Sequence, residues 1–327
     1  MSTIKDVARC AGVSIATVSR VLNKKGAVSP EAENAVTLAM QKLDYHPNHM
    51  ARALVKGRNN TIGVILPSFN NPFWSEIAQE IEKSAKEEGY HVLFSIAGEG
   101  EKGMDESISY LRASQVCGII QTFSASQEVW SAILKHVGLP LVALISDVKE
   151  VPSVVSDDTQ GGLLATRHLI AKGCKNLVHI SGDLKLQKHA DDRSFAFIEE
   201  CRKRGVAYRV YESCPEKLGL EDNLDLINRI FYENPQMDGI FASNDIMATQ
   251  CISYARSQGF RIPDDIRIVG YDDISISALI YPPLTTVRQN YAQLSKTAVR
   301  AIVDMVHQKT PKPLEVVPVE LIERKTT

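Results

Sequence analysis

Polar and aromatic side chains follow several expected strands, at the points where those strands end. Rings can stack on the C–H faces of a sugar, and planar polar groups can hydrogen-bond its hydroxyls in pairs. This combination of side chains therefore indicates a carbohydrate site. The set comprises Asn71, Phe73, Trp74, Asp157, Asp158, Arg193, Asn244, Asp245, Asp272, Asp273 and Gln289.

Each of these residues also has a structural interpretation. Asp157, Asp158 and Asp245 precede expected helices and can simply cap them. Phe73 or Trp74 can belong to the core, and Arg193 can pair with a neighbouring aspartate on the surface. The signal is the set as a whole, because parallel strands bring their carboxyl ends to one edge of a sheet.

A second group of candidate residues lies near the N-terminus, in TIKDVARCAGVSIATVSRVL. The sequence predicts two short helices: Thr3 and Asp6 form a capping-box pattern, Gly12 suits a sharp turn, and Ser14 can cap the second helix. Val18, Val21 and Leu22 would face inward. The outward face fits a DNA major groove, although an ordinary helical hairpin remains an alternative. Its residues are Ile15, Ala16, Thr17, Ser19 and Arg20.

A third helix is expected after Ser29, and a short basic segment, PNHMARALVKGRNN, follows it. The segment has room for only about two helical turns, too few to be stable alone. A helix that orders on DNA could insert Leu54 between base steps, whereas the alternative is a flexible linker.

Alternating strands and helices begin at residue 61 and imply parallel sheets with helices on both faces. Some 230 residues of this pattern suggest two lobes. Strands are expected at 61–66, 91–96, 117–123, 140–145, 176–181, 207–211, 238–243, 266–271 and 314–322, and helices at 73–88, 104–113, 126–136, 161–172, 191–204, 221–233, 245–258 and 290–308.

Charge is unevenly distributed along the 327 residues, which carry a net charge of −2. Residues 1–58 contain nine Lys/Arg against four Asp/Glu, a net of +5, which leaves 28 against 35 for the remainder, a net of −7. Only the N-terminal part is therefore expected to meet a polyanion.

Several functional classes lack support in the sequence. The six cysteines form no CxxC or zinc spacing, and we expect reduced thiols in a cytoplasmic protein without a membrane span. GEGEKG at 98–103 matches GxGxxG, but its glutamates would repel a pyrophosphate and Phe123 stands where a ribose-binding acid is expected. We therefore predict no catalytic residues, no metal and no cofactor.

Taken together, the motifs resemble the lac-repressor family of bacterial transcription regulators over the whole chain. The resemblance is carried by IKDVARCAGVSIATVSRVLN, YHPNHMARAL, NNPFW, FASNDIMA and VGYDDISISALIYPPLTTVRQ, in that order. It implies an α/β protein with a three-helix helix-turn-helix head (1–46), a hinge helix and linker (47–60) and a two-lobed, periplasmic-binding-protein-like core (61–327). Lobe one would span about 61–158 and 290–318, and lobe two about 159–289 and 319–327.

The resemblance also implies roles for the DNA-binding residues. Ile15, Ala16 and Arg20 would read the major groove, with the apolar pair favouring thymine methyls and Arg20 favouring guanine. Leu54 would enter the minor groove from the hinge helix. The other expected contacts, to phosphate, groove edge or hinge, are Thr3, Ser14, Thr17, Ser19, Asn23, Ala51 and Lys56.

In ribose-type relatives, seven of the strand-end residues match ligand contacts. In those relatives an Asp-Arg pair follows the strand that corresponds to PLVAL. This chain has Ile145 and Ser146 at these positions, so that only Asp147 could move into the ligand site in their place. Ribose itself is then disfavoured, and a larger sugar such as sucrose is an alternative. The full expected effector set is Asn71, Phe73, Trp74, Asp147, Asp157, Arg193, Asn244, Asp272 and Gln289.

The expected protein is a sugar-responsive homodimeric repressor that binds a near-palindromic double-stranded operator. The effector would be a small sugar or sugar phosphate, with a protein co-repressor as a further possible partner. The rival interpretations are a transport-type sugar-binding protein without a DNA role and a sugar-modifying enzyme on the same scaffold.

Overall fold

The computed structural model describes residues 2–23, 28–45, 60–97, 100–122, 127–182, 188–213 and 223–327. The chain divides into two compact units, Met1–Asn59 and Asn60–Thr327. The expected hinge segment, with Ala51, Leu54 and Lys56, lies outside the described residues, as do residues 98–99 and 123–126.

The first unit contains three helices, α1 (Ile4–Ala11), α2 (Ile15–Asn23) and α3 (Pro30–Lys42). Ser29 caps α3 as expected, because its side chain accepts a hydrogen bond from the N–H of Ala32. A small apolar core joins the three helices, and one residue from each, Val7, Val18 and Val36, is completely buried.

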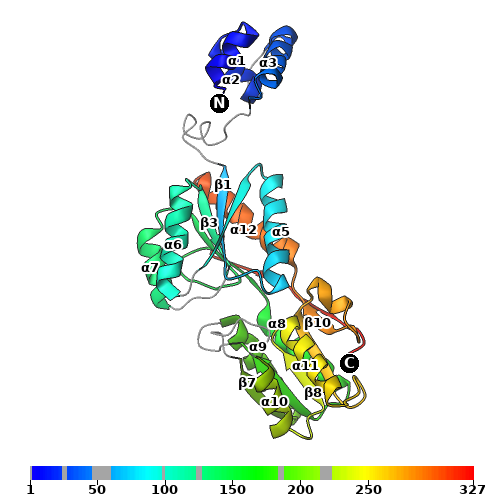
Figure 1. Cartoon of the computed structure of the whole chain (residues 1–327). Helices are drawn as coiled ribbons and strands as arrows, with labels where there is room; N and C mark the ends of the chain where they lie inside the picture. Colours follow the sequence, from blue (N-terminus) through cyan, green and yellow to red (C-terminus); the bar gives the residue numbers. More distant parts are fainter. Residues whose placement is uncertain are drawn as a thin grey trace. The chain divides into compact units, whose positions relative to one another are not determined.

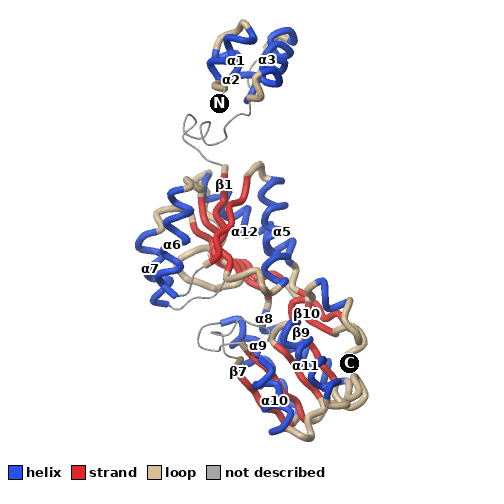
Figure 2. Tube along the Cα trace, viewed as in Figure 1, coloured by secondary structure: helices blue, strands red, loops and turns tan. Residues whose placement is uncertain are grey.

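The second unit contains two six-stranded sheets, which Figure 2 shows in red. The first runs β11-β5-β4-β3-β1-β2 and all its pairs are parallel. Its strands are β1 (Thr61–Leu66), β2 (His91–Ile96), β3 (Gly118–Gln121), β4 (Leu141–Leu144), β5 (Ser153–Ser156) and β11 (Leu314–Val317).

Helices cover both faces of this first sheet (Figure 1). Successive residues of β1 point to opposite faces: Val64 joins the core under α5 and α12, whereas Ile65 joins the core under α6 and α7. The strand is therefore apolar throughout, as expected for a fully covered parallel strand. The helices are α5 (Pro72–Glu87), α6 (Gly100–Ala113), α7 (Gln127–His136) and α12 (Tyr291–Val306).

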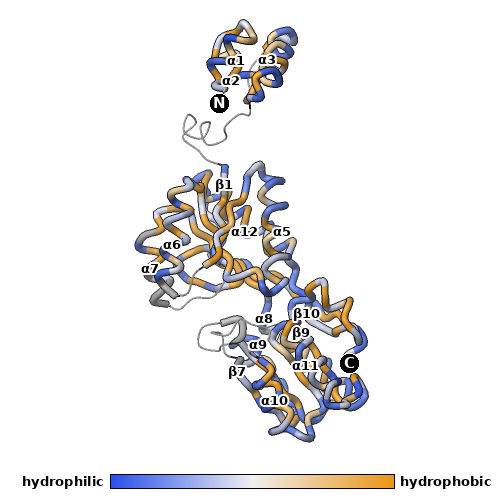
Figure 3. Tube along the Cα trace, in the orientation of Figure 1, coloured by the Kyte–Doolittle hydropathy of each residue, from blue (hydrophilic) through white to orange (hydrophobic). Residues whose placement is uncertain are grey.

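The second sheet repeats this plan in the order β12-β10-β9-β8-β6-β7. Two further cores lie under α8 with α9 and under α10 with α11. Figure 3 shows hydrophobic stretches along the strands and hydrophilic ones along exposed loops. The elements are β6 (Asn176–Ser181), β7 (Ala207–Glu212), β8 (Gly239–Ala242), β9 (Arg267–Asp272), β10 (Thr285–Arg288), β12 (Glu320–Ile322), α8 (Asp158–Ala171), α9 (Lys188–Arg204), α10 (Leu224–Glu233), α11 (Asp245–Ser257) and the 3-10 helix η2 (Ser275–Ala278).

The prediction of a single strand at 314–322 is wrong. Two strands form instead: β11 pairs in the first sheet, and β12 pairs antiparallel with β10 in the second. Pro318, which lacks an N–H, stands between them and interrupts the pairing. The chain passes between the sheets three times, after β5, after β10 and after β11.

Close packing of α8 on α9 depends on Gly162. A Cβ at this position would lie 2.6 Å from the carbonyl oxygen of Arg193 and 3.0 Å from the Cβ of Ala196. We expect Gly162→Ala to destabilise the protein by about 1–3 kcal/mol, because backbone must move to admit the methyl group. Urea unfolding measures this loss. Thr159→Ala, at an exposed position of the same helix, is the control, and equal stability of the two variants would contradict the packing argument.

Candidate functional site

The turn between α1 and α2 has the geometry that the sequence predicts. Gly12 adopts a left-handed conformation with φ 67°, and Asp6 and Thr3 complete a capping box at the start of α1. The Thr3 hydroxyl donates to the Asp6 carboxylate at 2.7 Å. Ser14 caps α2, since its Oγ accepts from the N–H of Thr17 at 3.1 Å.

The outward face of α2 carries the side chains proposed to read DNA. Ile15 is 46% exposed, which is unusual for an isoleucine, and Ala16 and Arg20 are also exposed. Thr17 and Ser19 are half-buried. Asn23 is the last residue of the helix. A short helix with exposed apolar and guanidinium groups has the surface chemistry that a major groove requires.

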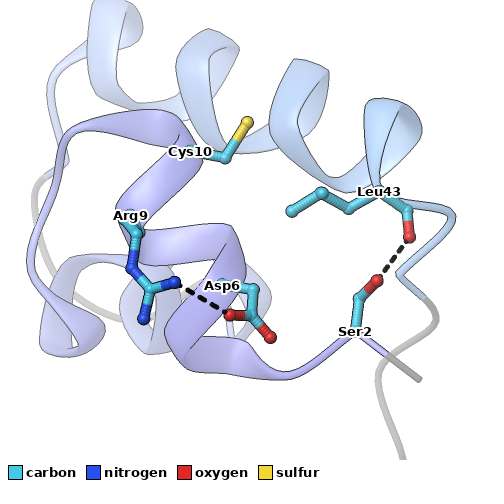
Figure 4. Close-up of a pocket in the computed structure, with 5 residues that line it drawn as sticks. All are labelled: Ser2, Asp6, Arg9, Cys10 and Leu43. Atoms are coloured by element: carbon cyan, nitrogen blue, oxygen red, sulfur yellow. Dashed lines mark hydrogen bonds and ion pairs between the residues drawn. The ribbon is translucent and has the colours of Figure 1, made fainter.

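A hollow of about 510 Å³ lies elsewhere on this unit (Figure 4). It is lined by residues of α1, the N-terminal segment and the end of α3, and none of its lining residues belongs to α2. The Ser2 hydroxyl donates to the Leu43 carbonyl at 2.8 Å, and an Arg9–Asp6 ion pair at 3.5 Å lies beside them. Arg9 is largely exposed, so this pair contributes little to stability.

Arg193 occupies the centre of a buried polar cluster in the second unit. Its Nε and one terminal nitrogen each lie 2.8 Å from Asp158 Oδ1, and the other terminal nitrogen donates to the Ser243 carbonyl at 2.7 Å. The guanidinium lies 3.5 Å from the centre of the Tyr271 ring, and the hydroxyl of this tyrosine donates to Asp158 at 2.8 Å. Arg193 is only 4% exposed, which rules out the surface ion pair.

A second hydrogen-bonded chain joins the ends of three strands. The Gln289 side-chain amide donates to Asp272 Oδ1 at 2.7 Å and accepts from the Ser156 hydroxyl at 2.5 Å. Tyr291 donates to the Asp272 carbonyl at 2.6 Å. Asp272 has φ 111°, a strained conformation for a residue with a side chain, and such strain is concentrated at functional positions.

Electrostatic interactions between Arg193 and Asp272 link the buried cluster around Arg193 with the hydrogen-bonded chain that contains Asp272. Burial would lower the pKa of Arg193, but the neighbouring Asp158, Tyr271 and Asp272 outweigh it and raise the pKa above its usual value. Burial raises the pKa of Asp272 well above its ordinary range, against the charge of Arg193. Arg193 is therefore a permanent cation, and Asp272 gains a proton more readily than a surface aspartate.

Comparison with known proteins places this geometry in a family. Residues 3–48 match the model of bacterial regulatory proteins of the lacI family, and residues 166–327 match a periplasmic binding protein-like domain. The chain is 36% identical to the ribose operon repressor of Halalkalibacterium halodurans, with 100% of this chain and 97% of that protein covered. The chain belongs to the lacI family.

Further comparisons agree with this assignment. The HTH-type transcriptional repressor PurR of Pasteurella multocida is 32% identical, with 100% of this chain and 98% of the relative covered. The lac repressor dimer bound to operator and the anti-inducer ONPF superposes with a TM-score of 0.89 at 27% identity, covering 99% of this chain and 98% of that one. As a lacI-family member, this protein is a DNA-binding transcriptional regulator, and the expected fold class is confirmed.

The lacI-family core brings together some of the expected effector residues but not all. Arg193, Asp272 and Gln289 belong to the two linked groups. Phe73 is instead 4% exposed and packs edge-on against Tyr291 in the core of the first sheet, with the half-buried Trp74 beside it. Asp147 is exposed on the loop after β4.

Three other expected effector residues serve as helix caps. The side chains of Asn71, Asp157 and Asn244 accept backbone hydrogen bonds at the starts of α5, α8 and α11. All three capping residues are half-buried, so each remains partly exposed to solvent. The carboxylate that pairs with Arg193 belongs to Asp158, the first helical residue, and not to its neighbour Asp157.

Three residues of the cluster were absent from the expected effector set: Ser156, Asp158 and Tyr271. Tyr271 lies inside a strand and carried no signal at a strand end, and Ser156, the last residue of β5, was not singled out. Asp158 was among the strand-end candidates, with a helix cap as its structural alternative, but it did not enter the expected effector set. The nearby glycine could have pointed to Tyr271, because a Cβ at Gly161 would lie 2.3 Å from its hydroxyl oxygen.

Asp245 has a structural role beside this cluster. It is completely buried, accepts from the hydroxyls of Thr286 and Ser277, and accepts from the N–H of Ile274 at 2.9 Å. Ile274 is itself 1% exposed and joins the core of the first sheet, and the next N–H, of Ser275, donates to Glu76 of α5 at 2.8 Å. Asp245 therefore holds a segment through which the chain after β9 contacts α5 and the core of the first sheet.

Stability should depend on pH through Asp245. Burial raises its pKa to about 7, outweighing the three hydrogen bonds that lower it. A carboxyl whose folded pKa is raised contributes stability below its unfolded pKa near 4 and loses it as pH rises towards 7. We expect the unfolding free energy of the wild type, relative to Asp245→Asn, to fall by on the order of 1–3 kcal/mol between pH 4.5 and 7.5. Parallel urea-unfolding curves across this range would contradict the assignment.

No metal or membrane site is visible in the described part of the chain. It contains no group of three or more His, Cys, Asp or Glu side chains arranged to hold a metal ion. None of its helices combines the length and the apolar composition needed to cross a membrane.

Proposed function

We propose that this protein represses a sugar-utilisation operon and that a small sugar or sugar phosphate, bound at the cluster of Arg193, Asp158, Asp272 and Gln289, changes its affinity for operator DNA. The observation that carries the proposal is Arg193, a buried guanidinium held by Asp158 and Ser243 with N–H groups left over for a ligand. Its 36% identical relative is named ribose operon repressor, which supports a sugar as effector.

The DNA-binding part of the proposal concerns the N-terminal unit. Residues 1–46 form the head and residues 47–60 the hinge, and Ile15, Ala16 and Arg20 contact base edges while Thr17, Ser19 and Asn23 contact phosphate or the groove edge. Support comes from the exposure of the first three on α2. Leu54, Ala51 and Lys56 act in the hinge. The protein works in the cytoplasm, where its operator is, and it catalyses no reaction.

The core is proposed to use two lobes, about 61–158 with 290–318 and about 159–289 with 319–327. Effector binding across them changes the balance between two lobe arrangements, and hence the spacing of the two heads in the dimer. A coupling free energy of about 1–3 kcal/mol corresponds to a 5–150-fold change in operator affinity.

A fluorescence anisotropy titration tests this function. The purified protein is titrated onto labelled duplexes tiled across the DNA upstream of its own gene, with random duplex as the control and with a panel of sugars and sugar phosphates. We expect one near-palindromic duplex to bind preferentially, and one ligand to change that affinity at least 5-fold. A failure of every ligand to change operator affinity would refute effector control.

A further inference from the structure

We infer that the effector of this protein is an uncharged, hydroxyl-rich sugar, and that Asp158 excludes its phosphorylated form. This inference rests on the proposed function and decides between the two classes of ligand that the function leaves open. Three observations support it: the charge of Arg193 is already compensated by Asp158, further acids lie nearby, and the nearby helix N-termini are already occupied by side chains.

The charge of Arg193 is already compensated before a ligand arrives. Two of its N–H groups are directed at one oxygen of Asp158, with both N···O distances 2.8 Å, and a third is directed at the Ser243 carbonyl. Three of the five guanidinium N–H groups are thus occupied, which leaves two for a ligand. Two N–H donors suit a pair of sugar hydroxyls, whereas a phosphate dianion needs uncompensated positive charge.

Among the described residues, the other titratable groups around Arg193 are acids, phenols and one histidine, and burial together with the charge of Arg193 lowers the pKa of this His179 to about 4, so that it carries no charge at neutral pH. Asp272 lies close enough to act on Arg193 electrostatically, and Tyr271 contacts both Arg193 and Asp158. In the described part of the chain, no other Arg or Lys forms a hydrogen bond or ion pair with Asp158, Asp272 or Gln289. Arg288 and Arg324 are directed instead at Asp273, with N···O distances of 2.6 Å. Among the described residues, an incoming anion would therefore meet no excess positive charge around Arg193.

Helix N-termini could in principle bind a phosphate, but three here are already occupied. The first helical residues of α8 and α11 are Asp158 and Asp245, whose carboxylates lie at the positive ends of those helices. In α5 the first residue is Pro72, which has no N–H, and Asn71 accepts from the next N–H at 3.0 Å. The N-termini of these three helices therefore provide little stabilisation for a bound phosphate.

The site retains the groups that recognise hydroxyls. The amide of Gln289 donates to the carboxyl of Asp272 and accepts from Ser156, and Tyr291 donates to the backbone carbonyl of Asp272. The carboxyl and the amide are therefore held in place and can bond a ligand without first being ordered. Ile145 does not supply a polar group, because it is 5% exposed and belongs to the core of the first sheet. The recognition chemistry is therefore that of a neutral polyol.

Matched ligand pairs test the inference by calorimetric titration of the full-length protein: ribose with ribose 5-phosphate, fructose with fructose 6-phosphate, and sucrose with sucrose 6-phosphate. We expect at least one neutral sugar to bind, with its phosphorylated partner at least 10-fold weaker. Tighter binding of a phosphorylated partner would overturn the inference and leave the proposed function standing. Failure of every neutral and phosphorylated sugar to bind would overturn both.

The variant Asp158→Asn tests the cause. It removes the negative charge beside Arg193 and keeps the size of the side chain, so we expect the ratio of neutral to phosphorylated affinity to fall at least 10-fold. Asp225→Asn, an equal change of charge at an exposed position of α10, should leave the ratio unchanged. An unchanged ratio in a folded Asp158→Asn protein would contradict the role of Asp158. If this variant does not fold, the wild-type ligand pairs still decide the inference.

Discussion

Replacement of Arg193 by alanine is expected to lower the free energy of unfolding by about 3–5 kcal/mol and to abolish the effector response. The variant leaves the Asp158 carboxylate buried without its cation, and an uncompensated buried charge of this kind is strongly destabilising. It also removes the donors proposed to bind the effector. Urea unfolding measures the first effect and operator anisotropy with effector measures the second.

Two further variants separate stability from recognition. Arg209→Ala removes an equal charge from an exposed position on β7 and should change neither property. Arg193→Lys keeps the charge but loses the planar fork, so it should retain more stability than alanine while still responding poorly. A normal effector response in either Arg193 variant would remove this residue from the site. Operator binding without effector should survive, because the head forms a separate compact unit.

The second large effect is expected for Arg20→Ala. One arginine–guanine contact contributes about 1–3 kcal/mol of discrimination, and a homodimer of the expected kind would place Arg20 on both half-sites. We therefore expect a loss of about 2–6 kcal/mol on the operator and a much smaller loss on random duplex, since contributions from separated sites add. Anisotropy titrations at fixed salt on both duplexes measure the difference.

Lys42→Ala is the matched control for this substitution. It removes one positive charge from the end of α3, at an exposed position outside the proposed reading face. It should weaken both duplexes by a similar, smaller factor, because a general charge effect carries no sequence information. If Arg20→Ala behaved in the same uniform way, Arg20 would be a phosphate contact and not a base contact.

Local sequence patterns predicted most of the fold, because the signals involved are strong. The capping box at Thr3, the cap at Ser14 and the covered strand at β1 each combine a residue preference with a periodic apolar pattern. The division of 314–322 into two strands was not predictable from apolar content alone. Their partners, β5 and β10, are distant in sequence, and only tertiary pairing assigns each strand to a different sheet.

The candidate site was predictable where a side chain follows a strand, and less so elsewhere. This reasoning selected Arg193, Asp272 and Gln289, which the structure brings into the two linked polar groups. It did not select Tyr271, which contacts Arg193, or Ser156, which donates to Gln289, because an alternating pattern cannot show which strand residue will meet a buried polar partner. Phe73 shows the limit of the same reasoning, because position after a strand does not distinguish a ring that meets a ligand from one that packs in the core, where Phe73 lies.

The packing of Ile274 opposes separation of the two sheets at this point. Its side chain is enclosed in the core of the first sheet, and withdrawing it would expose an isoleucine at a cost of about 1.5–3 kcal/mol, besides breaking the Ser275–Glu76 hydrogen bond. A rearrangement that keeps Ile274 in place avoids both losses, so we expect effector-linked movements to preserve this contact.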